Sequence, residues 1–407
     1  MKFVLFVFGI LLLVPVTAEE NSLDWDIDSI FDETTADKES EDSAAGVPVL
    51  DSVLRRGVIF DASYEFQAGF APGYEEEFSW APGVKMLVNF GLDARISDVF
   101  RVRTAFHFQI PNFEFYPDDF FFDYNVYDVV FFRGGKYDLS WGISPNYGFT
   151  NLLSRVASES DSGESYIVKA DIPLGAGGFQ ILSLTRADLI HGAEISRNDF
   201  GYGGKYNLAL RWADFNLAVY YKNGMPLRSF LSVKSTLWNT EVYSEGLVAV
   251  ETEASANSAV GTVGGAFNLG FARDLFDNKF SVNGELFFNE EGNTLWFRRK
   301  TSIREAGTPP FIEGFNLALN LFYRFNGKGS PRLFVQTRYA PLQNSAQLVP
   351  GLRLSPLSHV DIYLAVPMAL GSKDGYYYSH TEDPQNRPFS VMLFVTLKGD
   401  VRAAHFF

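Results

Sequence analysis

Charged and polar residues fall on one alternating set of positions in three consecutive segments between residues 58 and 110. This set comprises Asp61, Glu65, Lys85, Asp93, Arg95, Arg101, Arg103 and His107, and later segments add Lys205, Arg211, Glu285 and Arg324. Acidic and basic side chains that face each other across a water-filled space create a transverse field, which orders water and selects solutes. We predict such a constriction, with Arg101 and Arg103 as its first candidates. The alternative is an interior closed by salt bridges among these same side chains.

The residue types that support catalysis form no recognisable arrangement. A nucleophilic serine needs an activating histidine, and the chain has five histidines: His107, His191, His359, His380 and His405. The first lies on the charged set, and the next three fall in expected loops or turns. Gly-x-Ser-x-Gly, His-Glu-x-x-His and phosphate-cradling Gly-Lys-Ser/Thr motifs are absent from the sequence, and so is cysteine. We therefore expect no enzyme activity, no cofactor, no thiolate metal site and no disulfide.

The positions between the charged residues are apolar. The first segment carries Val58, Phe60, Ala62, Tyr64, Phe66, Ala68 and Phe70 on one parity, and two further segments of similar length follow near residues 84–95 and 100–110. A helix with 3.6 residues per turn would scatter such a set around its axis, whereas a strand keeps it on one face. The segments are therefore predicted strands, with apolar residues toward lipid and charged residues toward a lumen.

The same alternation returns along most of the chain, and the connections alternate in length. Short turns are expected near residues 97, 134, 176, 213, 327 and 357, and longer loops at 71–82, 111–119, 143–164, 187–200, 289–312 and 371–387. Outer-membrane barrels have short periplasmic turns and longer external loops. We expect about 18 strands. Because residues 129–142 and 229–250 are ambiguous, 16 strands stay open, and so do 14.

Composition points to the same class of protein. Aromatic residues make up 16% of the chain, yet the mean hydropathy is only −0.03. No run in the mature chain approaches the roughly 18 apolar residues of a spanning helix. Lipid forbids unpaired backbone polar groups, so the remaining spanning structure is a closed barrel. The sequence predicts an all-β fold, a transmembrane antiparallel up-and-down β-barrel over residues 54–407.

The N-terminal residues indicate export. Lys2, an apolar stretch and the small-residue pattern Val16-Thr17-Ala18 predict a cleaved signal peptide over residues 1–18. Residues 19–53 follow with twelve acids against one base, a net charge of −11 within a total of −15. So charged a segment cannot bury a core, and we expect a disordered acidic periplasmic arm. A barrel with such a leader belongs in the outer membrane of a diderm bacterium.

Within the arm, acids alternate with large apolar residues. The apolar members are Trp25, Ile27, Ile30 and Phe31. One interpretation is a docking motif that orders on a periplasmic partner or in the barrel mouth, and the other is a solvated spacer.

Residues 54–407 resemble the outer-membrane porin-like barrels, a broad class of diffusion channels and related transporters. In that class a terminal aromatic residue is the signal for the barrel-assembly machinery, and this chain ends His405-Phe406-Phe407. Since Lys398-Gly399-Asp400 looks like a turn, the last residues either complete a strand or form a tail. The segment from Arg133 to Gly142 is similar to glycine-rich strands of several porin-type families. The competing interpretation is a glycine turn, with Trp141 in an aromatic girdle.

A barrel of 16 or more strands is wide enough to leave a water-filled channel. We therefore expect a porin-like channel for passive diffusion of small solutes. The alternative is a surface adhesin or structural barrel that acts through long loops such as Ile143–Ser165 and Asn289–Pro310. A specific transporter with an N-terminal plug fits less well, because the arm is only 35 residues long and highly acidic. The expected partners are outer-membrane lipid, the assembly machinery and small solutes, without nucleic acid because the chain is acidic.

Overall fold

A computed structural model describes the barrel part of the chain. The described residues are 56–74, 78–111, 113–137, 139, 141–147, 166–185, 196–223, 225–252, 261, 263–289, 314–326, 330–372, 377 and 389–406. All of them belong to the compact unit Ala45–Phe407. The predicted signal peptide and acidic arm, with Trp25, Ile27, Ile30 and Phe31, lie outside these residues and stay predictions.

Strands make up almost all of the described structure. The first half contains β1 (Gly57–Tyr74), β2 (Phe78–Arg95), β3 (Phe100–Ile110), β4 (Glu114–Val126), β5 (Val130–Lys136), β6 (Tyr166–Leu174), β7 (Gly177–Thr185), β8 (Phe200–Ala209), β9 (Asp214–Lys222) and β10 (Leu227–Leu237). The second half contains β11 (Thr240–Val250), β12 (Val263–Leu275), β13 (Phe280–Asn289), β14 (Gly314–Arg324), β15 (Arg332–Ala340), β16 (Ser345–Leu357), β17 (Val360–Ala365), β18 (Met368–Gly371), β19 (Phe389–Ser390) and β20 (Met392–Phe406). Two short 3-10 helices are η3 (Arg197–Asp199) and η4 (Pro341–Gln343). Within the described part of the chain, no helix is long and apolar enough to cross a membrane.

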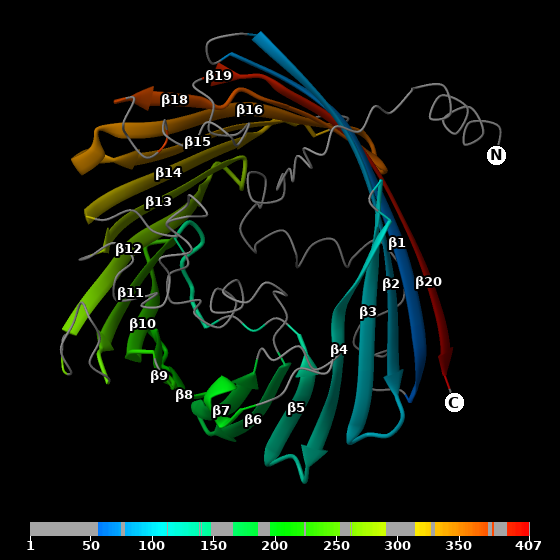
Figure 1. Cartoon of the computed structure of the whole chain (residues 1–407), viewed down its shortest axis with the longest axis vertical. Helices are drawn as coiled ribbons and strands as arrows, with labels where there is room; N and C mark the ends of the chain where they lie inside the picture. The colour runs from blue at the N-terminus through cyan, green and yellow to red at the C-terminus, as the bar shows by residue number, and fades with distance from the viewer. Residues whose placement is uncertain are drawn as a thin grey trace. The chain divides into compact units, whose positions relative to one another are not determined.

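The strands form one closed antiparallel ring. Consecutive strands pair from β1 to β17, β17 pairs with β20, and β20 pairs with β1, which joins the two ends of the sheet (Figure 1). β17 and β18 both pair with β16 and are separated only by Val366 and Pro367. β19 and β20 both pair with β1, with only Val391 between them. The 20 described segments therefore make 18 barrel strands, the number that the alternation favoured.

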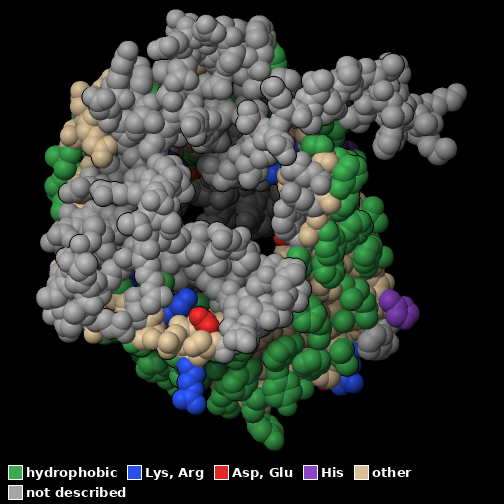
Figure 2. All heavy atoms as spheres, in the orientation of Figure 1, with side chains coloured by type: hydrophobic (Ala, Val, Ile, Leu, Met, Phe, Trp, Pro, Cys, Tyr) green, Lys and Arg blue, Asp and Glu red, His purple; other side chains and the backbone are tan. Residues whose placement is uncertain are grey.

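The two faces of the ring have the polarity that the alternation predicts. Apolar side chains on the outer parity are exposed, among them Phe60, Tyr64, Phe90 and Leu92. Polar side chains on the inner parity are buried, including Gln67, Asn268, Asn283 and Thr396. Figure 2 shows hydrophobic side chains over the outer wall, where Figure 1 places β1 to β5. Such an inverted surface requires an apolar solvent outside the ring.

Several expected connections differ from those observed. The region 71–82, predicted to be a long loop, is mostly strand, because β1 and β2 stay paired as far as Tyr74 and Phe78. Similarly, β4 begins at Glu114, so most of the predicted loop 111–119 is strand. The turn predicted near residue 134 lies instead at residues 127–129, and Gly134 is inside β5. The ambiguous region 229–250 is the hairpin of β10 and β11.

Close packing explains two glycines that look like turn residues. A Cβ atom at Gly134 would lie 2.8 Å from the ring of Phe122 on β4. Gly399 lies opposite Tyr64 in the β1–β20 pairing, and a Cβ atom there would overlap the Tyr64 ring. The expected turn at Lys398-Gly399-Asp400 is therefore wrong, since β20 runs through it to Phe406. The final residues complete a strand as far as Phe406, and Phe407 lies outside the described residues.

Candidate functional site

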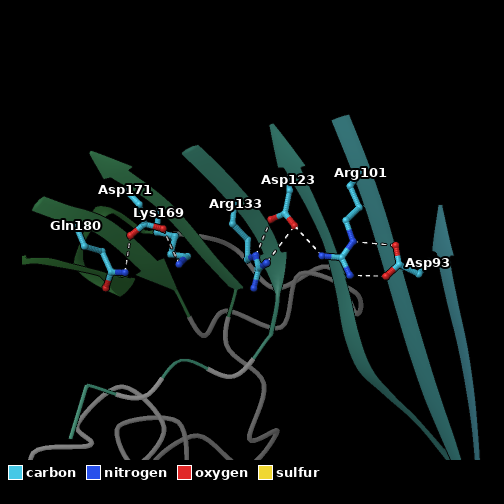
Figure 3. A network of polar contacts seen from close by, with 7 residues as sticks. All are labelled: Asp93, Arg101, Asp123, Arg133, Lys169, Asp171 and Gln180. Atoms are coloured by element: carbon cyan, nitrogen blue, oxygen red, sulfur yellow. Dashed lines mark hydrogen bonds and ion pairs between the residues drawn. The ribbon is translucent and has the colours of Figure 1, made fainter. Parts of the chain in front are cut away.

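A ladder of ion pairs crosses the inner faces of β2 to β5 (Figure 3). Arg101 on β3 donates from Nε to Oδ1 of Asp93 at 2.8 Å, and its Nη2 contacts the other oxygen of that carboxylate. Asp123 on β4 lies between two guanidinium groups. It is 3.6 Å from Nη1 of Arg101, and it accepts from Nε and Nη2 of Arg133 at 2.6 and 3.0 Å. The four residues form a chain of alternating charge.

Three more polar residues continue the line on β6 and β7. Lys169 lies opposite Arg133 in the strand register and pairs with Asp171 through Nζ and Oδ2 at 2.7 Å. Gln180 donates from Nε2 to Oδ1 of Asp171 at 2.7 Å (Figure 3). Three acids and three bases balance along the line. Because Arg101 is the second residue of β3, the ladder lies close to the short-turn end of the barrel.

The structure places the predicted lumen residues in different surroundings. Arg101 and Asp93 are joined in the ladder, whereas Arg103 lies opposite Asp93 and Phe121 in the register. His107 Nδ1 contacts Oδ1 of Asp118 at 2.5 Å. The remaining predicted lumen residues lie apart from the ladder, along β1 and β2. Glu65 accepts a hydrogen bond from Gln67 at 2.7 Å, and Arg95 donates one to the backbone oxygen of Asp98 at 3.4 Å. Asp61 packs against Gly91, and Lys85 lies opposite Gln67 in the strand register.

Three of the later candidates lie on or near β8 and β14. Lys205 is on the inner parity of β8, opposite Gln180 and Ala218. Arg211 is not on a strand face, because β8 ends at Ala209 and Arg211 is exposed in the turn that follows. The alternating pattern ran past the true end of the strand and misassigned it. Arg324 is the exposed last residue of β14.

The connection after β5 enters the lumen. Trp141 is only 2% exposed, and its Nε1 donates to Oε1 of Gln180 at 2.6 Å. Its ring lies 5.4 Å from that of Phe230 on β10 and packs so closely on Gly203 that a Cβ there would be 2.6 Å away. Trp141 is thus an inward anchor, and its expected place in a lipid-facing aromatic girdle is wrong.

Residues 143–147 are bound to the wall formed by β11, β12, β13 and β14. Two buried carboxylates receive them. Glu245 on β11 accepts from the backbone N–H of Ile143 at 2.5 Å. Glu285 on β13 accepts from Ser144 Oγ at 3.0 Å and from the backbone N–H of Asn146 at 3.1 Å. Backbone donors that would otherwise be unsatisfied inside the ring are therefore paired with charged acceptors.

Further contacts fix both the carboxylate and the segment. Glu285 also accepts from Tyr243 OH at 2.7 Å and from Asn268 Nδ2 at 3.2 Å. The side chain of Asn146 donates to Asn283 at 2.9 Å and accepts from Asn320 at 2.7 Å. The ring of Tyr147 stacks on Phe287 with centroids 4.9 Å apart. We call residues 141–147 the inward segment. It crosses from β5 to the far wall near the middle of the strands.

Sequence reasoning identified Glu285 as inward-facing but missed its partners. Glu285 and Asn146 are 139 residues apart, and the inward segment has no periodic pattern. One signal was available: β12, β13 and β14 carry asparagines on the inner parity, namely Asn268, Asn283, Asn289, Asn316 and Asn320. Such neutral amides on neighbouring strands are suited to bind a polypeptide backbone, because each offers both donors and an acceptor. Among the described residues, no group of three His, Cys, Asp or Glu side chains is arranged to hold a metal ion.

No protein-family model and no curated protein matches the sequence. Solved structures do match the fold. Pseudomonas aeruginosa OccK11 (OpdR) aligns over 86% of this chain and 98% of its own, with 10% identity and a TM-score of 0.53. P. aeruginosa OpdL aligns over 85% and 98%, with 8% identity and a TM-score of 0.53. P. aeruginosa OccK5 (OpdH) aligns over 84% and 98%, with 11% identity and a TM-score of 0.51. The chain therefore has the 18-stranded fold of the porin-like outer-membrane β-barrels.

Proposed function

We propose that the protein is an outer-membrane channel through which small solutes diffuse passively, and that the inward segment narrows its lumen. The observation that carries this proposal is the attachment of residues 141–147 to the far wall through the buried carboxylates of Glu245 and Glu285. A ring of 16 to 18 strands is wide enough to hold an aqueous channel. A segment that crosses such a ring at mid-depth reduces the opening.

The ladder supports a role in selecting solutes. Charges on the wall of a narrow aqueous channel act strongly on passing ions, because the low-dielectric wall behind them focuses their field into the channel. Arg101 and Arg133 remain about one-third exposed, although both contact Asp123. Both guanidinium groups can therefore contact solutes in addition to the carboxylate of Asp123, which they share. With three acids and three bases, the ladder orders polar solutes rather than rejecting one sign of charge.

The surroundings of the protein follow from the same proposal. An exported chain with this fold is embedded in outer-membrane lipid and is inserted there by the barrel-assembly machinery. Passage is passive, and the cargo is a small polar solute. Residues 25–31 of the acidic arm would bind a periplasmic partner.

Conductance of the refolded full chain in a planar bilayer tests the proposal. We expect discrete conductance steps, and reversal potentials that change when Arg101 and Arg103 are replaced by alanine. Arg56→Gln, which removes a charge outside the strands, is the matched control and leaves the reversal potential unchanged. A barrel that inserts but never conducts would refute the channel and favour a structural or adhesive barrel. Unchanged selectivity in the double variant would remove those two arginines from the constriction.

A further inference from the structure

The closing strand β20 is longer than one of the two strands that pair with it. β1 stays paired with β20 as far as Phe406, whereas β17 begins at Val360, which lies opposite Leu397 (Figure 1). Within the described part of the chain, no strand pairs with the other side of residues 399–406. We call residues 399–406 the β20 edge. It lies at the end of the barrel that carries the short turns.

The backbone of the β20 edge has groups that point away from β1. The amide of Lys398 does so, because it donates to the backbone oxygen of His359 at 2.9 Å. Backbone groups alternate in direction along a strand, and the β1–β20 register has no shift. The groups of Asp400, Arg402 and Ala404 therefore point to the same side as those of Lys398, and all three residues are exposed. Such an edge is a template for another strand, and native proteins normally cover it.

The two faces of the β20 edge differ in polarity. On the outer parity Val401 is 67% exposed, and Ala403 lies opposite the exposed Phe60 of β1. On the inner parity Lys398 and Arg402 are basic, with Asp400 between them. Lys398 is 3.4 Å from Asp361 on β17, whereas Arg402 has no ion pair among the described residues. A strand that fits this edge has apolar residues on one parity and acids on the other.

Residues 23–32 of the acidic arm have that pattern in the sequence. Their odd positions are mostly apolar and their even positions mostly acidic. The apolar set is Leu23, Trp25, Ile27 and Phe31, and the acidic set is Asp24, Asp26, Asp28 and Asp32. Ten residues that alternate in this way have the length and the period of a strand with one apolar face.

The connection between this segment and the barrel is long enough for it to reach the edge. Residues 33–56 lead to Gly57, which begins β1 and lies opposite Phe406. The far side of β20 is two strand spacings from β1, roughly 10 Å. A chain of 24 residues extends to at most about 80 Å. Since segment and edge belong to one chain, their effective concentration is on the order of millimolar.

We propose that residues 23–32 add a strand to the β20 edge, with their apolar residues beside Val401 and their acids beside Arg402. A second copy is a poor match, because copies in one membrane share their orientation and their β20 strands run the same way. Two edges related by a two-fold axis have to be antiparallel to pair. The segment covers the open edge in this arrangement, and a periplasmic partner of residues 25–31 has to displace it.

The first test is residue-resolved hydrogen exchange of the full chain in lipid bilayers. We expect the amides of Asp400, Arg402 and Ala404 to exchange roughly tenfold or more slowly in wild type than in Ile27→Pro, because proline breaks the added strand. Ala36→Pro, elsewhere in the arm, is the matched control and keeps the slow exchange. The amides of Val401 and Ala403, which point to β1, stay protected in all three chains. Fast exchange of the first set in wild type, or slow exchange that survives Ile27→Pro, overturns the proposal.

The second test uses disulfide formation, which the absence of cysteine from the sequence makes clean. Ile27→Cys is combined in turn with Val401→Cys and with Ala403→Cys, and we expect one of these pairs to form a bond within the chain on mild oxidation. Asp28→Cys with the same partners is the matched control, because its side chain would lie on the opposite face, and it should react several-fold more slowly. Equal rates mean an arm that is not paired, and bonds between chains mean a second copy. Either result overturns the proposal, and neither test depends on whether the lumen conducts.

Discussion

The backbone N–H of Asn146 donates a hydrogen bond to Oε1 of Glu285, 139 residues away, at 3.1 Å. This bond joins a loop that leaves one wall of the barrel to a strand of the opposite wall. Glu285 is 4% exposed and, within the part of the chain that the structure describes, it accepts hydrogen bonds from Ser144, Asn146, Tyr243 and Asn268. Its charge is therefore dispersed over a preorganised set of donors, and the position of the inward segment depends on it.

Replacing Glu285 with alanine should release the inward segment. Hydrogen bonds to a buried charged group contribute roughly 1.5–3 kcal/mol each, and donors left unpaired add their desolvation, so we expect a loss of stability on the order of 3 kcal/mol. In planar bilayers the variant should show a higher and noisier single-channel conductance. Asp128→Asn, which removes an exposed carboxylate from a turn, is the control. If the Glu285→Ala channel has the wild-type conductance, the inward segment does not limit passage.

Replacing Gly203 with alanine should displace Trp141. The new Cβ would lie 2.6 Å from the Trp141 ring, and overpacking of this kind costs roughly 1–3 kcal/mol. We expect a weaker near-ultraviolet circular dichroism signal from the tryptophans and a lower unfolding midpoint. Gly204→Ala is a closely matched control, because the nearest atom to its new Cβ would be the backbone oxygen of Gln180, at 3.9 Å. Equal effects of the two substitutions would contradict the anchoring of Trp141 on β8.

Asp123→Asn should change ion selectivity. Asp123 is the carboxylate that Arg101 and Arg133 share, so its loss leaves two guanidinium groups with less neutralisation. The ladder then carries one net positive charge, and we expect the reversal potential in a salt gradient to shift toward anions. The shift should shrink at high salt, since the screening length falls from about 10 Å at 0.1 M to about 3 Å at 1 M. A shift of the opposite sign, or none at low salt, would place the ladder outside the ion path.

Asp98 should titrate below its usual range. The guanidinium of Arg56 donates to it at 3.0 Å and holds the pKa of this carboxyl below its ordinary value. A carboxyl whose pKa is depressed by folding contributes stability above its unfolded pKa of about 4, and loses that contribution as the pH falls through the folded value. Both groups are exposed, so the effect on stability is small. Carboxyl NMR titration should show the Asp98 pKa rising in Arg56→Gln and in high salt; an unchanged midpoint would contradict the pairing.

Replacing Gly399 with valine should weaken the closing pair of strands. The Tyr64 ring occupies the space above Gly399, across the β1–β20 pairing. We expect Gly399→Val to lose its resistance to unfolding in detergent at a lower temperature than wild type, as seen in the gel mobility of unheated samples. The control is Gly246→Ala in β11, where a Cβ meets nothing within 4 Å. A wild-type transition temperature in Gly399→Val would show that the seam tolerates movement of Tyr64.

Strand periodicity predicted the ring well, and local turn chemistry predicted its connections less well. The period of two placed the apolar face of β1 and the charged face of β3 correctly, because the side-chain direction is fixed by the backbone itself. Glycine was the main source of error. At Gly134 and Gly399 it makes room for an aromatic ring on the next strand, and this use has the same local signature as a turn.

The inward segment could not be predicted from local pattern. Trp141 is held by Gln180, Gly203 and Phe230 on three different strands, so its environment exists only after the ring has formed. A tryptophan next to a glycine-rich strand looks the same in the sequence whether its ring points into the lumen or toward lipid. The ladder was only partly foreseen. Arg101 and Asp93 were identified, whereas Asp123 and Arg133 fell in a region where the strand boundary was misplaced.

The β1–β20 pairing extends over fourteen residue pairs, from Gly57 with Phe406 to Phe70 with Leu393. Every other strand pairs with a near neighbour in the chain, whereas this pairing unites its beginning and its end. Until the last strand arrives, the sheet has two open edges, whose backbone groups would be unpaired in lipid and available to pair with another chain in water. A chain that ends before β20 would therefore keep both edges open and would tend to aggregate through them.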